Sequence, residues 1–387
     1  MSNKISIKEL LEGVDVEWKS LGEVVVTITA PLKVKREAYC ETGKTPIIDQ
    51  GINFIAGYIN EDLSIVPSDE YIVFGDHSEH IKYVNFSFVQ GADGLKILKS
   101  KGDNTKFLYY AFLNFYQKEQ NYKRHWTTAK ETLIPIPEPE VQSEIVRILD
   151  NFTELTAELT AELRARKKQY SYYRDKLLTF EDGEVGLKPL DEVGELVRGN
   201  GLPKADFTED GVPAIHYGQI YTYYGTSTTK TKSFVSAETA KKLRKVNKGD
   251  VVITNTSENL EDVGKALVYL GELEAVTGGH ATIFKPNNEI LGKYFTYYTQ
   301  SSMFFSQKVK YAKGTKVIDV SATDLGKFKI PLPSLAEQEK IVSILDKFDI
   351  LTNSISEGLP KEIELRQKQY EYYRDLLLSF PKKEVEA

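Results

Sequence analysis

Basic side chains stand beside hydroxyl, amide and aromatic groups at several points of the sequence, and this combination suits contact with nucleic acid. Cations bind phosphate, and Arg, Lys, Asn, Ser and Thr can also hydrogen-bond the edges of bases. Two of these stretches lie at matched positions, each before a proline-rich motif, which favours a function for them. For any single stretch, a solvated turn is an equally good interpretation. The candidate DNA-binding residues are Lys123, Arg124, His125, Trp126, Thr127, Lys230, Lys232, Asn255, Lys313, Thr315 and Lys316.

No catalytic site is predicted. The sequence lacks the phosphate-binding pattern G-x-x-x-x-G-K-[ST], the dinucleotide pattern G-x-G-x-x-G and an Asn/Asp-Pro-Pro-aromatic tetrapeptide of methyltransferases. His77 and His80 have a spacing that could hold a metal, but without further ligands we interpret them as turn histidines. Cys40, the single cysteine, has no marked base beside it and excludes a disulfide framework. No metal and no cofactor are expected in this chain, while an enzyme with a weakly marked nuclease or methyltransferase core stays open as an alternative.

The net charge of −6 argues against a nucleic-acid binder, but this average conceals a segregation of charge. Residues 226–248 contain seven Lys or Arg against the single acid Glu238. Residues 301–330 contain six lysines against Asp319 and Asp324. Phosphate contact needs a local positive field and not a basic whole protein. Charge alone therefore supports DNA binding and a solvated surface about equally.

Composition is that of a globular protein, with 27% charged and 41% hydrophobic residues. The 387 residues are enough for two or more domains. The first residues, MSNKISIKELLEGVDVEW, lack the apolar centre of a signal peptide, and no run of about 18 apolar residues predicts a membrane span. We therefore expect a cytoplasmic protein with no membrane contact.

Two blocks of sequence occur twice, in the same order. IPIPEPEVQSEIVRILDNF at 134–152 recurs as IPLPSLAEQEKIVSILDKF at 330–348, an offset of 196 (330 − 134). RKKQYSYYRDKLLTF at 166–180 recurs as RQKQYEYYRDLLLSF at 366–380, an offset of 200 (366 − 166), with eleven of fifteen positions identical. A period this long indicates a duplicated module with a domain in front of each helix. The second copy has four extra residues (200 − 196) between its blocks.

Globular and helical segments alternate along the chain. Short strands separated by Gly, Asp and Asn turns precede each I-P-x-P motif, and an aromatic-rich helix is expected late in each domain, at Thr105–Gln120 and Leu291–Lys308. The prolines end each domain because they cannot continue a helix. The predicted segments are an N-terminal segment (1–17), a first domain (18–136), a first spacer helix (137–181), a second domain (187–333), a second spacer helix (334–380) and a tail (381–387).

Both helical segments carry an apolar seam with steps of three and four residues, which predicts that they pair as an antiparallel coiled coil. The alternative is that each helix packs only on its own domain. Gly358 and Pro360 are expected to interrupt the second helix, with Pro360 in the first turn of its continuation. The predicted coil residues are Leu155, Leu159, Leu163, Tyr170, Tyr173, Leu351, Ile355, Leu359, Ile363, Tyr370 and Tyr373.

These features resemble the specificity subunit of a bacterial type I restriction–modification system. The resemblance rests on the I-P-x-P handover with its I-V-x-I-L-D continuation, on the TAEL repeat and on both Q-Y-x-Y-Y-R-D-x-L-L-x-F endings, and it covers essentially the whole chain. It implies an α+β fold with two globular target-recognition domains, each followed by a long helix, and with the two helices paired antiparallel. The TAEL repeat lies only in the first helix, so strict pseudo-symmetry of the coil is not expected.

The resemblance also implies a function. Each domain would read one half of a bipartite site in double-stranded DNA, and the helices would set the spacing and dock two methylation subunits, with restriction subunits outside. Methyl transfer from S-adenosylmethionine and cleavage driven by ATP with Mg would belong to those partners, which makes this chain a non-catalytic subunit. An assembly scaffold that reads no bases is a second alternative, for which paired helices suffice.

Overall fold

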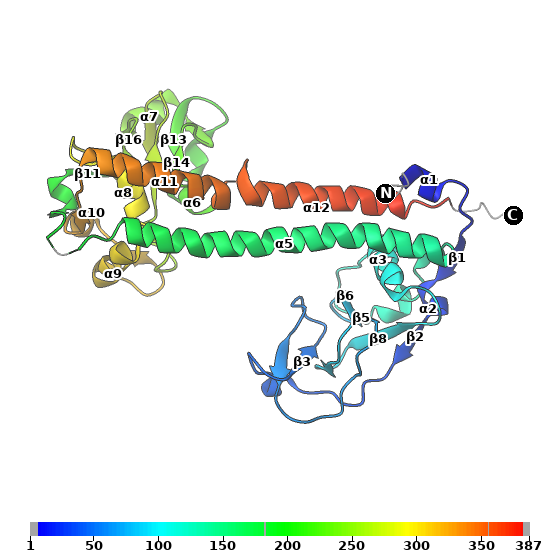
Figure 1. Cartoon of the computed structure of the whole chain (residues 1–387). Helices are drawn as coiled ribbons and strands as arrows, with labels where there is room; N and C mark the ends of the chain where they lie inside the picture. Colours follow the sequence, from blue (N-terminus) through cyan, green and yellow to red (C-terminus); the bar gives the residue numbers. More distant parts are fainter. Residues whose placement is uncertain (1–6, 182, 355, 382–387) are drawn as a thin grey trace. The chain divides into compact units, whose positions relative to one another are not determined.

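The computed structural model describes residues 7–181, 183–354 and 356–381. It divides into two compact units, one formed by Met1–Ala157 with Leu365–Ala387 and the other by Glu158–Glu364. Each unit holds one globular domain together with parts of the long helices (Figure 1). The predicted coil residue Ile355, the start of the predicted N-terminal segment (1–6) and most of the predicted tail (382–387) lie outside the described residues.

The first domain is closed by an antiparallel pair, β1 (Glu17–Ser20) with β9 (Leu133–Ile136), which joins its two ends. A four-stranded sheet has the order β2-β8-β5-β6, and a three-stranded sheet has the order β4-β3-β7. The strands of both sheets are short, as the frequent turn residues predict. Their bounds are β2 (Val25–Ile28), β3 (Thr45–Ile48), β4 (Gly57–Ile59), β5 (Tyr71–Gly75), β6 (Ile81–Val84), β7 (Val89–Gln90) and β8 (Leu95–Ser100).

Helix α3 (Thr105–Phe115) lies between the four-stranded sheet and the first long helix (Figure 1). The Asn104 side chain caps it by accepting the N–H groups of Lys106 and Phe107. The sequence predicts a helix that continues to Gln120, and this prediction is wrong at its end. The chain leaves the helix at Tyr116, where a buried carboxylate from the β5–β6 turn binds the Tyr116 hydroxyl and the backbone N–H groups of Glu119 and Gln120, as described below. The short helix α4 (Trp126–Ala129) follows before β9.

The second domain repeats this plan with larger sheets, of orders β11-β21-β17-β19-β14 and β12-β15-β13-β20-β16. The pair β10 (Leu187–Pro189) with β23 (Lys329–Pro331) closes it, as β1 and β9 close the first domain. The other strands are β11 (Gly194–Arg198), β12 (Phe207–Thr208), β13 (Val212–Ile215), β14 (Ser227–Thr228), β15 (Ser233–Val235), β16 (Arg244–Val246), β17 (Val251–Thr254), β18 (Thr256–Ser257), β19 (Ala266–Tyr269), β20 (Ala275–Thr277), β21 (Ala281–Pro286) and β22 (Ile318–Asp319).

The helix predicted at Leu291–Lys308 is two helices, α8 (Gly292–Tyr298) and α9 (Ser302–Tyr311). The break has a local cause, because the Ser301 hydroxyl accepts the N–H of Phe304 and so begins a new helix. The sequence prediction missed it because aromatic residues continue through both helices. Shorter helices are α6 (Tyr217–Thr222), α7 (Ala237–Lys242) and α10 (Ala322–Gly326).

The repeated blocks form long helices. The first copy is one helix, α5 (Pro139–Leu177), and the second is α11 (Leu335–Asn353) followed by α12 (Gly358–Leu377). The predicted interruption is confirmed, with Pro360 in the first turn of α12. Gly358 has a φ of +73°, and a Cβ there would lie 2.3 Å from the backbone oxygen of Ile350, so only glycine fits this turn.

Within each unit, one repeat copy packs against the other. In the first unit the ring of Phe152 stacks on Tyr373, with centroids 5.2 Å apart, and in the second unit Phe348 stacks on Tyr173 at 5.8 Å. The same two positions therefore meet twice with their roles exchanged, as antiparallel pairing of two copies requires. Tyr170 and Leu359 are buried, and the other predicted coil residues that the structure describes are half-buried except Tyr173, which is 38% exposed.

The helices also complete the domain cores, so the alternative in which each packs only on its own domain is wrong. Leu377 and Leu378 from the end of α12 are fully buried in the core of the first unit, beside Ile145 and Leu149 of α5. Leu178, at the end of the first copy, is buried in the core of the second unit beside Ile341. Each domain thus rests on both copies of the repeat.

A glutamine in each copy fastens the helix to its domain. Gln142 accepts the N–H of Asn104 at 2.9 Å and donates to the oxygen of Pro137 at 2.9 Å. Gln338 accepts the N–H of Leu291 at 2.9 Å and donates to the oxygen of Pro333 at 3.0 Å. In each copy the side-chain amide thus hydrogen-bonds a backbone oxygen of the proline motif and a backbone N–H at the start of an aromatic-rich helix. These bonds give the repeated glutamine a structural role.

A repeated aspartate acts in the same way. Asp150 accepts hydrogen bonds from Lys106 Nζ and the Tyr110 hydroxyl, both at 2.7 Å. Asp346 accepts them from Lys293 Nζ at 2.8 Å and from the Tyr297 hydroxyl at 2.6 Å. These charge-assisted bonds join α3 to α5 and α8 to α11. The repeated sequence therefore encodes the joint between each domain and its helix.

Candidate nucleic-acid interface

Two of the predicted DNA-binding loops occupy equivalent places in the two domains. Asp76 directly follows β5, and its backbone oxygen accepts the N–H of His125, just before α4, at 2.8 Å. Asn255 directly follows β17, and its backbone oxygen accepts the N–H of Val320, just before α10, at 2.9 Å. One contact thus ties each loop to the end of a central strand. The matched positions seen in the sequence correspond to matched positions in the fold.

The loop of the first domain presents cations. Lys123, Arg124 and Thr127 are exposed. Lys123 pairs with Glu119 at 2.5 Å, while its backbone oxygen lies 3.0 Å from Nδ1 of His77. The loop backbone is therefore fixed while its basic side chains face solvent, which suits contact with phosphate or base edges.

Two of the residues predicted as DNA contacts in this loop are buried or half-buried. His125 is fully buried, and its Nε2 lies 2.9 Å from the backbone oxygen of Asn121. Its assignment as a DNA contact is wrong, because a buried ring that holds the loop from inside does not face DNA. Trp126 is half-buried, with its ring 6.0 Å from Phe74, so its main role is packing.

The loop of the second domain is held by a small ladder. Strand β22 pairs antiparallel with β18, so Ile318 and Asp319 lie beside Ser257 and Thr256. The backbone of Lys313 exchanges two hydrogen bonds with that of Asp319. The loop between them exposes Lys313, Thr315 and Lys316, three of the predicted DNA-binding residues. Thr315 and Lys316 are therefore exposed on a loop with a fixed base, whereas the Lys313 ammonium pairs with Asp324 at 3.1 Å.

Asn255 is a second correction. It is fully buried, its amide donates to the oxygen of Val320 at 2.7 Å, and its side-chain oxygen accepts the Thr282 hydroxyl at 2.9 Å. All of this side chain's contacts lie inside the domain. Asn255 is therefore a support for the Lys313 loop and not a DNA contact.

Lys230 and Lys232 are exposed but lie elsewhere. They follow β14, which pairs with the last residues of β19, Val268 and Tyr269. Because β19 runs antiparallel to β17, that edge is opposite to the end of β17 that Asn255 follows. The structure does not bring these two lysines together with the Lys313 loop.

Other side chains that the sequence reasoning missed lie next to the two loops. In the first domain, Gln50 accepts the N–H of His77 at 3.2 Å. In the second, His280 lies 3.0 Å from the Thr256 hydroxyl and 4.9 Å, ring to ring, from Tyr217. A signal was available, because Gln50 and Tyr217 share one position in the matching strings KTPIIDQGIN and GVPAIHYGQI.

Asp324, in α10, is an acid that binds two lysines next to the loop of the second domain. Hydrogen bonds from Lys327, from the Ser321 hydroxyl and from Lys313 lower the pKa of Asp324 to about 2. Both lysines are more exposed than the acid, so solvent screens part of this attraction. The contact engages the terminal ammonium of Lys313, one of the predicted DNA-binding lysines.

Replacing Asp324 by Asn is expected to lower the free energy of unfolding at neutral pH by on the order of 1 kcal/mol. Because the pKa of Asp324 is lowered by folding, its contribution is present above the ordinary carboxyl pKa and is lost as pH falls. The difference between variant and parent should therefore shrink between about pH 4 and pH 2. Chemical denaturation at several pH values measures it, and a difference independent of pH would contradict this account.

Among the residues that the structure describes, no group of three or more His, Cys, Asp or Glu could hold a metal ion. His77 and His80 lie in the β5–β6 turn, where Nδ1 of His80 is 3.1 Å from the backbone oxygen of Gln50. Within the same described ranges, no helix is both long and apolar enough to span a membrane.

Comparison with known proteins accounts for the whole chain. The profile of the family "Type I restriction modification DNA specificity domain" matches twice, at residues 13–166 and 183–365. The chain is 40% identical over 408 residues to the type I restriction enzyme EcoR124I/EcoR124II specificity subunit of Escherichia coli, covering 100% of this chain and 99% of that protein. It is 31% identical to a putative type I restriction enzyme specificity subunit of Haemophilus influenzae, covering 98% and 99%.

Solved structures agree on the fold. The S subunit of a type I restriction–modification system from M. genitalium matches with a TM-score of 0.59 at 17% identity, covering 96% of this chain and 98% of that one. A chain from a study of complex assembly in a type I system matches with a TM-score of 0.60, also at 17% identity, covering 95% and 98%. With two matches to the family profile and a 40% identical relative along its full length, this chain belongs to the family of type I restriction–modification DNA specificity subunits.

Proposed function

We propose that this chain reads a bipartite site in double-stranded DNA, one half-site per domain, and contributes no catalytic group of its own. The observation that carries the proposal is the equivalent anchoring of two different exposed loops, through Asp76 in the first domain and Asn255 in the second. A duplicated scaffold that holds non-identical loops is suited to two different short sequences. Phosphate contacts would place each loop, and its polar side chains would read base edges.

Catalysis in this proposal belongs to partner subunits. Methylation subunits would supply S-adenosylmethionine, and restriction subunits would use ATP and Mg. The cytoplasm, where chromosomal and incoming DNA meet the complex, would be its location. The double copy of the helical repeat supports two methylation subunits, because two equivalent surfaces bind two copies of one partner.

Tyr172 and Tyr372 are the best candidates for that docking. They occupy the same position in the two copies, and they are 62% and 64% exposed. Core packing accounts for their neighbour Tyr170, which is 5% exposed, but it does not account for a tyrosine repeated at an exposed position. Exposed tyrosines are frequent anchors of protein interfaces. We therefore assign these two side chains to contact with the methylation subunits.

Exchange of the first domain tests the reading function. Residues 18–136 are replaced by the corresponding domain of a relative, and the methylated sequences are mapped in cells that hold the partner subunits. The expected result is a new first half-site beside an unchanged second half-site. An unchanged methylation pattern would favour a scaffold that reads no bases. Methylation or cleavage by the purified chain alone would favour the enzyme alternative.

A further inference from the structure

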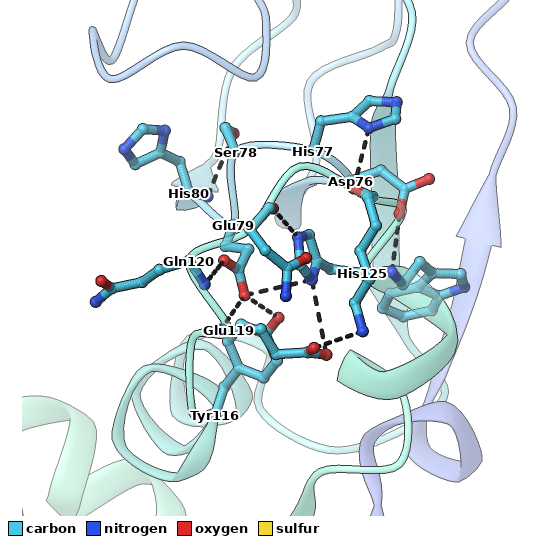
Figure 2. A network of polar contacts seen from close by, with 12 residues as sticks. Asp76, His77, Ser78, Glu79, His80, Tyr116, Glu119, Gln120 and His125 are labelled. Atoms are coloured by element: carbon cyan, nitrogen blue, oxygen red, sulfur yellow. Dashed lines mark hydrogen bonds and ion pairs between the residues drawn. The ribbon is translucent and has the colours of Figure 1, made fainter.

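Glu79, in the turn between β5 and β6, is a charged residue that the fold buries, with only 3% exposed. Its carboxylate accepts three hydrogen bonds, from the Tyr116 hydroxyl at 2.7 Å and from the backbone N–H groups of Glu119 at 2.7 Å and Gln120 at 2.8 Å (Figure 2). These charge-assisted bonds all reach the segment that leaves α3. One acid thus fixes the start of the exposed loop that follows.

The backbone around this contact is strained. Glu79 has a φ of +56° and Gln120 a φ of +54°, the two positive values found at residues other than glycine in the described part of the chain. The two strained residues are bonded to each other, and such conformations persist only where the surroundings determine them. Burial alone would raise the pKa of Glu79, but its hydrogen bonds outweigh this and hold the pKa below the ordinary value. The acid is therefore charged at neutral pH.

Further contacts hold the rest of the loop to the same turn. The backbone N–H of His125 donates to the backbone oxygen of Asp76 at 2.8 Å, and Nδ1 of His77 lies 3.0 Å from the backbone oxygen of Lys123. Nε2 of the His125 ring contacts the backbone oxygen of Asn121. Nδ1 of the same ring lies 3.6 Å from Glu79 and makes no hydrogen bond within the described residues. The loop backbone is therefore ordered before any ligand arrives, which lowers the entropy that binding must overcome.

What this ordered loop displays is an aromatic pair. Tyr122 is 90% exposed, and its ring stacks on the ring of His77, with centroids 5.3 Å apart and an angle of 17° between the planes. Lys123 and Arg124 are exposed directly after it. A large apolar side chain held out in water beside two cations gains little from the fold itself. Such a surface suits DNA, because cations bind phosphate while the ring contacts base edges, thymine methyl groups or sugars.

We infer that Tyr122 and His77, here called the recognition pair, contact bases of the first half-site, and that Glu79 is the positioning residue that holds the pair in place. This inference rests on the proposed reading of DNA by the first domain. Tyr122 lies outside the set predicted from the sequence, and Glu79 acts only through the loop. The second domain holds its own loop differently, through the ladder of β18 and β22, as expected if the two half-sites differ.

The first experiment measures affinity at one fixed salt concentration with the full chain and three labelled duplexes. One duplex carries the bipartite site found by methylation mapping, and the others have either the first or the second half-site scrambled. Tyr122→Ala is expected to weaken binding to the intact site about 10-fold or more, as loss of a base contact does. Tyr122→Phe keeps the ring and should restore most of the affinity. Tyr223→Ala, which removes a 49% exposed tyrosine of the other domain, is the matched control.

The three duplexes also locate the effect. In the Tyr122→Ala variant the preference for the intact over the scrambled first half-site should fall, while the preference at the second half-site stays as in the parent. An unchanged affinity, or an equal loss at both half-sites, would overturn the role of the recognition pair.

Glu79 is tested through its coupling to the pair. Glu79→Gln keeps the size but replaces one acceptor oxygen by an amide group, so it should weaken binding about 5-fold. In the Tyr122→Ala background, the same change should cost clearly less affinity than in the parent, because part of its effect passes through Tyr122. Full additivity of the two losses would show that Glu79 has only a structural role. If domain exchange changes the half-site while Tyr122→Ala does not alter binding, the proposed function stands and this inference fails.

Discussion

Replacing Tyr172 and Tyr372 together by Ala is expected to leave the chain folded but without bound methylation subunits, so that the assembled system no longer methylates its site. A tyrosine at the centre of an interface commonly contributes about 2 kcal/mol or more to the binding free energy. Its loss therefore weakens the affinity for each subunit about 30-fold. Fold stability should change little, because the two rings are 62% and 64% exposed. Native mass spectrometry of the chain with its partner gives the stoichiometry directly.

The single variants make this test sharper. Tyr172→Ala alone and Tyr372→Ala alone should each remove one of two bound subunits, since the repeat provides two equivalent surfaces. Tyr122→Ala, which removes a 90% exposed tyrosine of the candidate DNA loop, is the control and should leave the stoichiometry unchanged. Two subunits bound to the double variant would exclude these tyrosines from docking.

The architecture was accessible from the sequence because the duplication records contacts. Phe152 and Phe348 recur with an offset of 196 (348 − 152), Tyr173 and Tyr373 with an offset of 200 (373 − 173), and these four residues form the two reciprocal stacks. A repeated helix with an apolar seam needs a partner, and its second copy is available in the same chain. The antiparallel pairing followed from the seam and the repeat alone.

The candidate site was less accessible, because burial depends on residues far away in the sequence. His125 has the residue type and the basic neighbours of a DNA contact, yet a hydrogen bond to Asp76 from the β5–β6 turn places it inside the domain. Asn255 is likewise buried by contacts with Thr282 and Val320. Nothing in the sequence indicated that Glu79 is buried, since an acid in a turn is usually solvated. Only the structure shows that the segment following α3 packs on it.

The basic stretch at 226–248 shows that the local electrostatic field, too, depends on residues distant in the sequence. Lys245 pairs with Glu274 at 2.8 Å, and Lys248 pairs with Glu272 at 2.5 Å. These acids follow the stretch in sequence and offset part of its positive charge. Local counts of charge overestimate the field wherever a neighbouring strand returns acids to the same surface.

Deleting Thr160–Leu163 is expected to abolish recognition of the original site and to create a new site with the same half-sites but a shorter gap. The helix α5 is continuous from Pro139 to Leu177 and runs from the first unit, which includes Ala157, into the second unit, which begins at Glu158. Four helical residues correspond to a rise of about 6 Å and to about 40° of rotation beyond one turn. If the two domains read half-sites as proposed, a continuous helix shared by both units would set the gap between those half-sites.

The size of the change follows from two competing terms. A rise of about 6 Å matches about two base pairs at 3.4 Å each, whereas a rotation of about 40° matches about one base pair of helical twist. The tolerated gap should therefore shorten by one base pair if rotation decides and by two if translation decides. Insertion of one further TAEL unit after Leu163 should lengthen the gap by the same amount, because it adds the same four helical residues.

Methylation mapping in cells that hold the partner subunits reads both the half-sites and the gap in one measurement. Thr160→Ala keeps the helix length and is the matched control, with the parental gap expected. The deletion removes one half-buried leucine from a seam that otherwise keeps its spacing, since Leu155 and Leu159 remain four residues apart. The deletion variant should thus stay folded, which circular dichroism verifies. A folded deletion variant that methylates the original site with its original gap would exclude α5 as the element that measures the distance between half-sites.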